Sequence, residues 1–127
     1  FYGPHFPAVF DFANFVQVGQ ETLPAYELLK PYVTYVHVKD AQWGTGTVVP
    51  AGQGDGHVGE ILADLIGGGW KGFLSLEPHL TDFAGLAALE QDPQKRGSAL
   101  DGKAAWKLAL DALHTILETI PQAKEAL

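Results

Sequence analysis

The 127-residue sequence contains no cysteine and no methionine. Without cysteine the protein has no disulfide bond, no thiolate metal site and no cysteine nucleophile. No apolar run approaches the ~18 residues that a membrane-spanning helix needs, and the first residues lack the basic segment and cleavage site of a signal peptide. With 46% hydrophobic and 18% charged residues, the composition is that of a folded globular domain.

Basic residues are also scarce. Eight Lys and Arg stand against 15 Asp and Glu, for a net charge of −7. This balance disfavours a nucleic-acid partner, because phosphate binding needs a basic face. Residues 1–70 hold seven acids and two bases, so this stretch carries a charge of −5. An acidic segment of this kind suits a divalent cation, although acidity that only keeps the protein soluble explains the charge equally well.

Short β-like runs alternate with helical stretches along the chain. The expected strands are 8–13, 32–38 and 73–77, and the expected helices are 23–29, 58–66, a short one at 82–90 and a long one after Asp101. Residues 41–57 are expected to form a flexible Gly-rich loop, or partial lid, over the strand ends, and 91–100 a polar loop. The order predicts an α/β fold with parallel strands, and the runs read as strands covered on both faces.

The last helix has a clear start and stop in the sequence. Asp101 is a good N-cap residue, and Pro121 is expected to end the helix. Helical spacing predicts a buried face that consists of Trp106, Leu110, Leu113 and Leu117.

Each expected strand carries a polar residue at or near its carboxyl end: Asp11, His37 and Glu77. A single one of these would usually be a helix cap or part of a loop salt bridge. Three in successive strands point to one site, because ligands in parallel α/β folds bind at the carboxyl ends of the strands. Asp, His and Glu together suit a divalent cation such as Mn²⁺, Mg²⁺, Co²⁺ or Zn²⁺.

Three further residues are candidates for contact with a substrate. Asn14 follows Asp11 in the next turn, Lys39 shares the strand face of His37, and His79 follows Glu77 across a proline. Lys39 either binds an anionic or hydroxylated substrate or forms a surface ion pair with Asp40. His79 contacts the substrate, supports Glu77, or is simply a loop histidine.

Four segments together resemble the xylose isomerase-like TIM barrel superfamily, which includes sugar phosphate isomerases and epimerases. They are 9–15 (VFDFANF), 36–40 (VHVKD), 52–56 (GQGDG) and 72–79 (GFLSLEPH), and they occur in the order of the family's C-terminal half. The resemblance implies that residues 1–127 are a C-terminal fragment of a (β/α)8 barrel with about three βα units. A full barrel needs about 250 residues.

The resemblance also implies a site. In that family a Glu, an Asp, a His and a second Glu bind one divalent metal, and Asp11, His37 and Glu77 match the last three. The implied reaction is proton transfer beside a carbonyl through a metal-stabilised enediolate, with Glu77 as one of two acid/base residues. The first Glu belongs to a strand before residue 1, so the fragment alone is expected to be inactive.

The sequence departs from one branch of that family. The ketose 3-epimerases carry a His where Asn14 stands and an Arg in the loop after the metal His, and residues 41–57 contain no Arg. Both departures disfavour a ketose 3-epimerase in particular.

Two alternatives remain open at this point. One is a non-catalytic half-barrel that binds a sugar or a metal or merely assembles, and the other is an apurinic endonuclease-like nuclease, which the charge of −7 disfavours.

The expected ligand is a sugar or sugar phosphate, with no nucleic acid and no membrane. The expected location is the cytoplasm. A half-barrel exposes strand edges and apolar faces, so we expect it to pair with another copy or with the missing N-terminal half.

Overall fold

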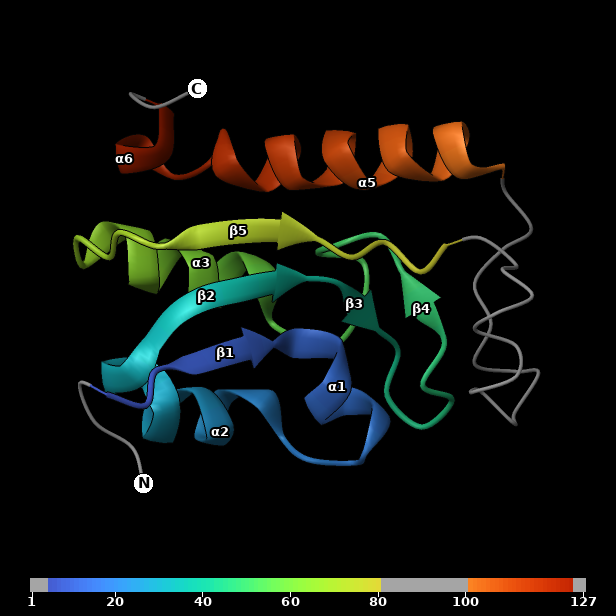
Figure 1. The fold of residues 1–127 in the computed structure, drawn as a ribbon. Coiled ribbons are helices and arrows are strands. Elements are labelled where there is room, and N and C mark those ends of the chain that lie inside the picture. Colours follow the sequence, from blue (N-terminus) through green and yellow to red (C-terminus); the bar gives the residue numbers. More distant parts are fainter. Residues whose placement is uncertain (1–4, 81–100, 125–127) are drawn as a thin grey trace.

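The computed structural model describes residues 5–80 and 101–124. Within these ranges strands alternate with helices (Figure 1). The strands are β1 (Ala8–Asp11), β2 (Val33–Val38), β3 (Asp40–Ala41), β4 (Val48–Val49) and β5 (Phe73–Leu76). The helices are α1 (Phe12–Gln17), α2 (Thr22–Leu29), a 3-10 turn (Lys30–Tyr32), α3 (Val58–Gly67), α5 (Gly102–Leu117) and α6 (Pro121–Lys124). The helix expected at 82–90 and the loop expected at 91–100 lie outside the described residues.

The three longer strands form one parallel sheet in the order β1-β2-β5. Asp11 is the register partner of His37, and His37 is in turn the partner of Ser75 on β5. Helices connect the strands in sequence, so the α/β prediction and the parallel pairing are confirmed. Parallel strands need such crossover connections, because a tight turn can join only antiparallel ones.

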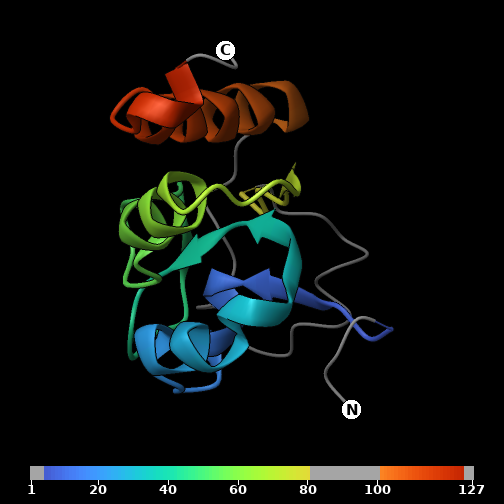
Figure 2. The ribbon, with the colours of Figure 1, turned by 90° about the vertical axis from the view of Figure 1, so that its left-hand side faces the viewer.

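The helices cover one face of this sheet, as the side view shows (Figure 2). Phe10 and Val36 point to that face and are fully buried in the core, which also contains side chains of α2, α3 and α5. Val9 and Phe73 have the opposite parity and are 53% and 75% exposed. We expected both faces to be covered, and among the described residues that expectation is wrong, because no helix lies over the second face.

Helix α5 begins as predicted, and the predicted burial is confirmed for Leu113 and Leu117 but not for Trp106 and Leu110. The Asp101 carboxylate accepts a hydrogen bond from the Ala104 N–H at 2.8 Å, which is a normal N-cap. Trp106 and Leu110, however, are 54% and 42% exposed, so their predicted burial is wrong. The buried stripe consists of Ala105, Ala109, Leu113 and Leu117. Ala105 and Ala109 pack with Val48 and Leu80, and the next residue after each alanine, Trp106 and Leu110, faces away from that contact.

The end of this helix also differs from the prediction. Helix α5 stops at Leu117, and Pro121 begins the short helix α6 instead of ending the long one. A proline is well accommodated at a first helical position, where its missing N–H would have no partner within the helix. None of the described helices is long and apolar enough to cross a membrane.

The Gly-rich segment after β2 is more ordered than a loose lid. β3 and β4 pair antiparallel within it, with Asp40 opposite Val49. The fully buried Asp40 carboxylate accepts hydrogen bonds of 2.9 to 3.0 Å from the backbone N–H groups of four residues: Ala41, Gly52, Gly54 and Gly56. Burial raises the pKa of Asp40, and the four N–H bonds oppose that rise. The segment therefore folds around Asp40.

Candidate metal centre

Asp11 stands where β1 ends and α1 begins. Its backbone is extended, and its Oδ1 atom accepts a 3.0 Å hydrogen bond from the Asn14 N–H, so Asp11 is the N-cap of α1. Because of this cap the strand ends at Asp11. We had expected it to continue to residue 13. One carboxylate oxygen is used in the cap, and the second, Oδ2, is left for the site. Asn14 reaches Asp11 through its backbone N–H.

Strand register brings the other two candidate ligands to Asp11. His37 is the direct neighbour of Asp11 across the β1–β2 pair. On the far side, the Glu77 N–H donates to the Val38 carbonyl at 3.2 Å and extends the ladder one residue beyond β5. Side chains alternate between the two faces of a sheet, so all three functional groups gather on the face that no described helix covers, which we call the open face.

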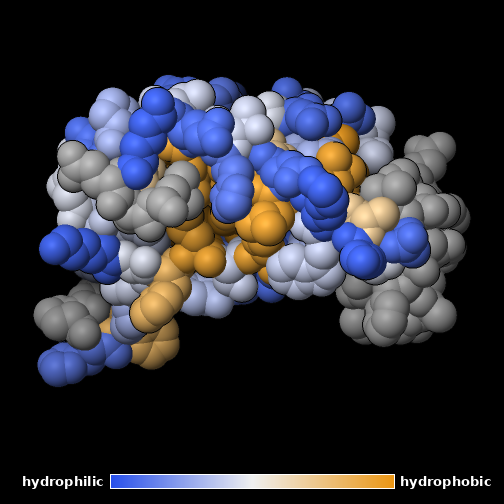
Figure 3. Space-filling view, turned by 90° about the horizontal axis from the view of Figure 1, so that it is seen from above, coloured by the Kyte–Doolittle hydropathy of each residue, from blue (hydrophilic) through white to orange (hydrophobic). Residues whose placement is uncertain are grey.

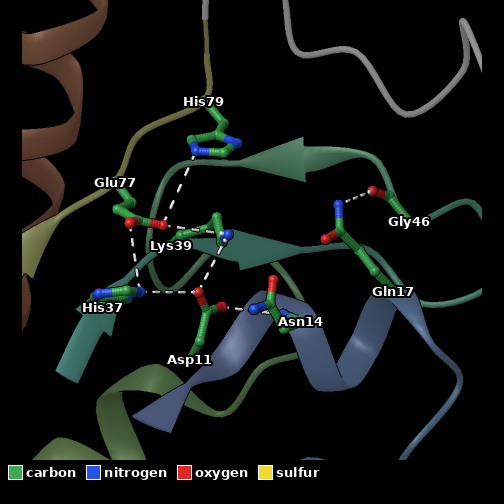
Figure 4. Close-up of polar contacts among 8 residues, drawn as sticks. All are labelled: Asp11, Asn14, Gln17, His37, Lys39, Gly46, Glu77 and His79. Atoms are coloured by element: carbon green, nitrogen blue, oxygen red, sulfur yellow. Dashed lines mark hydrogen bonds and ion pairs between the residues drawn. The ribbon is translucent and has the colours of Figure 1, made fainter. Parts of the chain in front are cut away.

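The three side chains offer one ligand atom each, and these atoms all lie within 4.8 Å of one another. His37 Nδ1 is 3.4 Å from Asp11 Oδ2 and 3.4 Å from Glu77 Oε1 (Figure 4). Asp11, His37 and Glu77 thus form a triad that could hold a metal ion. Residues 66 positions apart meet here because three parallel strands end at the same edge of the sheet.

Lys39 lies in the centre of the same cluster. Its Nζ atom is 3.1 Å from Asp11 Oδ2 and 3.4 Å from Glu77 Oε2, and the residue is only 7% exposed. The alternative of a surface pair with Asp40 is wrong, because Lys39 is buried against the two triad carboxylates and the Asp40 carboxylate is engaged by backbone N–H groups. This placement on the open face had been predicted, because Lys39 follows His37 by two residues and side chains two apart in a strand share a face.

His79 completes the polar group at its outer end. Its Nε2 atom lies 3.9 Å from Glu77 Oε2, and both side chains are about equally accessible (Figure 4). The backbone of His79 has a φ of 44°, in the left-handed region that non-glycine residues seldom adopt. Strain of this kind persists only where the surrounding structure requires it, and it is concentrated at functional sites.

The chemistry of the residues fits a divalent cation. Asp11 Oδ2 is buried and has no hydrogen-bond partner among the described residues. Its contact with Lys39 is an ion pair that lacks hydrogen-bond alignment, whereas the contact of Lys39 with Glu77 does count as a hydrogen bond. An imidazole nitrogen and two carboxylates are ligands that Mn²⁺, Co²⁺ and Zn²⁺ accept, and the carboxylates also suit Mg²⁺.

One contact near the site was not anticipated from the sequence. The Gln17 side chain donates to the Gly46 carbonyl at 3.1 Å and so fastens the turn between β3 and β4 to α1 (Figure 4). No sequence signal pointed to it, since a lone glutamine at a helix end is ordinary. A separate surface pocket of about 500 Å³ lies beside the start of α2, and its lining includes no residue of the triad.

Comparison with known proteins places the fold. No family model matches the sequence, and no curated protein matches it. Among solved structures, a crystal structure of a xylose isomerase domain protein from Planctomyces limnophilus is similar, with a TM-score of 0.65 and 24% sequence identity. The match covers 93% of this chain and 40% of that one. The chain therefore has the fold of part of that protein and spans well under half of its length.

Proposed function

We propose that this chain is part of a divalent-metal-dependent sugar or sugar phosphate isomerase or epimerase. The observation that carries the proposal is the convergence of Asp11, His37 and Glu77 at the carboxyl ends of three parallel strands. Ligands of parallel α/β folds bind at this edge, and the similar solved structure is a xylose isomerase domain protein. The four sequence segments that resemble the superfamily are the same segments that build this edge.

The triad would hold the ion, with one ligand atom from each side chain. Such an ion supplies Lewis acidity, which stabilises the negative charge that develops on substrate oxygens when a neighbouring carbon loses a proton. The cap of α1 keeps the Asp11 carboxylate in place, because its Oδ1 atom is tied to the Asn14 N–H. The ladder bond from Glu77 to Val38 does the same for the backbone of Glu77.

Glu77 is the proposed acid/base residue of this chain. Its Oε1 atom faces His37, and its Oε2 atom faces both Lys39 and His79. A carboxylate that is held in this way can take a proton from a substrate carbon and return it, provided that the substrate lies within hydrogen-bond reach. The family pattern supplies a second Glu on the opposite side of the substrate, and that residue would come from outside residues 1–127.

The remaining polar residues are proposed substrate contacts. Lys39 brings a positive charge that suits a phosphate or a polarised hydroxyl group. His79, 29% exposed at its side chain, offers a ring nitrogen at the outer edge of the site. Asn14 is exposed in the first turn of α1, close to Asp11, where its side-chain amide suits a sugar hydroxyl.

The uncovered surfaces favour assembly into a larger unit. Val9 and Phe73 are exposed on the open face of the sheet, which carries the triad, and Trp106 and Leu110 are exposed on α5. Hydrophobic residues also show between hydrophilic ones when the molecule is seen from the side of α5 (Figure 3). The chain spans 40% of the similar structure, and we propose that the rest of a barrel covers these surfaces. The same exposure favours, as a second candidate, a non-catalytic half-barrel that only assembles.

The test of the proposed activity uses the longest natural protein that contains this chain. It is incubated in D₂O with Mn²⁺ and a panel of aldoses, ketoses and their phosphates, and NMR follows deuterium entry at the carbon next to the carbonyl. We expect exchange that Glu77→Gln reduces by about 10²-fold or more. Glu60→Gln is the matched control, because Glu60 is an exposed glutamate that pairs with His57 outside the site. Absence of exchange with every substrate, also when Mg²⁺, Co²⁺ or Zn²⁺ replaces Mn²⁺, would favour the non-catalytic module.

A further inference from the structure

The Lys39 ammonium group sits on the same two carboxylates that would bind the ion. Its Nζ atom is 3.1 Å from Asp11 Oδ2 and 3.4 Å from Glu77 Oε2. Asp11 Oδ2 is the buried oxygen that has no hydrogen-bond partner among the described residues, and it also faces His37 Nδ1 at 3.4 Å within the triad. Two cationic groups, the ammonium and a divalent ion, therefore compete for one pair of acids.

The position of Lys39 is built into the fold. The residue is 7% exposed, and it lines a small void together with the apolar side chains of Val49 and Leu76. A lysine buries its methylene stem against apolar surface readily, but its charged end needs an anionic partner when it is withdrawn from water. Here the partners are Asp11 and Glu77, so the ammonium balances the acids in the absence of a metal.

We propose that Lys39 is a built-in cation that holds the site together without metal and that an entering divalent ion displaces from Asp11 and Glu77. The proposal rests on the metal site of the proposed function. Like charges at contact distance repel strongly in a partly buried site, so the ammonium must move away from the carboxylates when the ion binds. The displaced ammonium is then available to an anionic substrate group, which sets an order of binding: metal first, anion second.

The first test is the affinity for Mn²⁺, measured by calorimetry on the wild-type chain and on Lys39→Met. Methionine keeps the apolar stem and removes the charge, so we expect Mn²⁺ to bind about tenfold more tightly or better. Lys39→Arg keeps the charge and should bind no more tightly than the wild type. Lys107→Met is the matched control for total charge, because Lys107 is exposed and pairs with Asp111 on α5. It should leave the affinity unchanged.

The second test uses the wild-type protein alone and measures acetylation of each lysine by mass spectrometry. We expect Lys39 to be protected without metal and to become reactive when Mn²⁺ is added, while Lys107 reacts equally in both states. If wild type binds Mn²⁺ but Lys39→Met binds no more tightly, or if Lys39 stays protected at saturating Mn²⁺, the displacement proposal is overturned and the metal site stands. If neither protein binds Mn²⁺, both this proposal and the proposed function fall.

Discussion

His37 Nδ1 lies 3.4 Å from Asp11 Oδ2 because the two residues are register partners in the parallel pair of β1 and β2. Backbone hydrogen bonds of the sheet therefore fix the distance between the first two proposed ligands. A shift of the pairing by one residue would send one of the side chains to the helix-covered face. The geometry of the site is thus a property of the strand register, and two of its three members are paired directly across β1 and β2.

Asp11 has two duties, and two substitutions separate them. Asp11→Asn keeps a side-chain oxygen for the cap of α1, whereas Asp11→Ala removes it. Both variants lose the charge that faces Lys39 and His37, so both should lose Mn²⁺ affinity. We expect Asp11→Ala to be less stable than Asp11→Asn by about 1 kcal/mol, the usual value of an N-cap. Urea denaturation without metal measures the difference, and equal stabilities would show that the cap contributes nothing.

Gly56 has no room for a side chain. A Cβ atom there would lie 2.7 Å from Asp40 Oδ1 and 2.8 Å from the Phe12 Cβ. We expect Gly56→Ala to lower the free energy of unfolding by about 1–3 kcal/mol, because buried side chains must shift. Gly102→Ala is the control, since nothing lies within 4 Å of its Cβ position at the start of α5. Thermal denaturation should show a lower Tm for the first variant only, and a wild-type Tm for Gly56→Ala would argue against the tight packing around Asp40.

The acid dependence of stability should follow the link between α2 and α3. Asp64 accepts hydrogen bonds from Lys30 and from the Tyr26 hydroxyl, and these partners lower its pKa. Its folded pKa lies below the unfolded value of about 3.9. The stabilisation is therefore complete above that value and is lost as the pH falls through the folded pKa.

Asp64→Asn tests this link. The variant should be less stable than the wild type at pH 6, and the difference should shrink toward zero as the pH drops below about 4. Because both charged side chains are partly exposed, salt should also reduce the difference. Urea denaturation at a series of pH values measures it. A difference that stays constant down to pH 2 would mean that the charge of Asp64 is not the cause.

The exposed residues on the open face should drive association of the 127-residue chain. Phe73→Thr places a β-branched residue, which suits a strand, in β5 and removes a ring that is 75% exposed. We expect sedimentation velocity to show self-association of the wild-type chain and a shift of Phe73→Thr toward monomer. Leu28→Gln, at an equally exposed position on α2, should associate like the wild type. A wild-type chain that sediments as a single monomer would contradict the prediction.

The strands and helices could be predicted from the sequence because their residues recur at a regular spacing. The meeting of the triad could be predicted because its residues stand at the ends of successive strands. A run of β-branched and aromatic residues marked β2, a short apolar run closed by Pro78 marked β5, and polar residues at the strand ends marked Asp11, His37 and Glu77. Parallel strands that end at one edge then brought the three residues together. These features depend on periodicity and chain direction, which a sequence displays.

Other features could not be predicted because they leave no such pattern. β3 and β4 have two residues each, too few for any alternation. The bonds to Asp40 come from backbone N–H groups, which every residue but proline possesses. On α5, the choice between the stripe with Trp106 and the stripe with Ala109 depends on packing against Val48 and Leu80, which are distant in the sequence. The sequence also could not show whether Lys39 pairs with Asp40, because tertiary packing places its ammonium group beside Asp11 and Glu77.

The central claim is that Asp11, His37 and Glu77 bind one divalent cation. The most direct measurement is a crystal structure of the protein with Mn²⁺, with anomalous scattering recorded at a wavelength at which manganese scatters strongly. The account predicts one anomalous peak between the three side chains, with Asp11 Oδ2 and a Glu77 oxygen as ligands, and its loss in Glu77→Gln. Saturating Mn²⁺ with no peak at the triad, or with a peak only elsewhere on the surface, would contradict it.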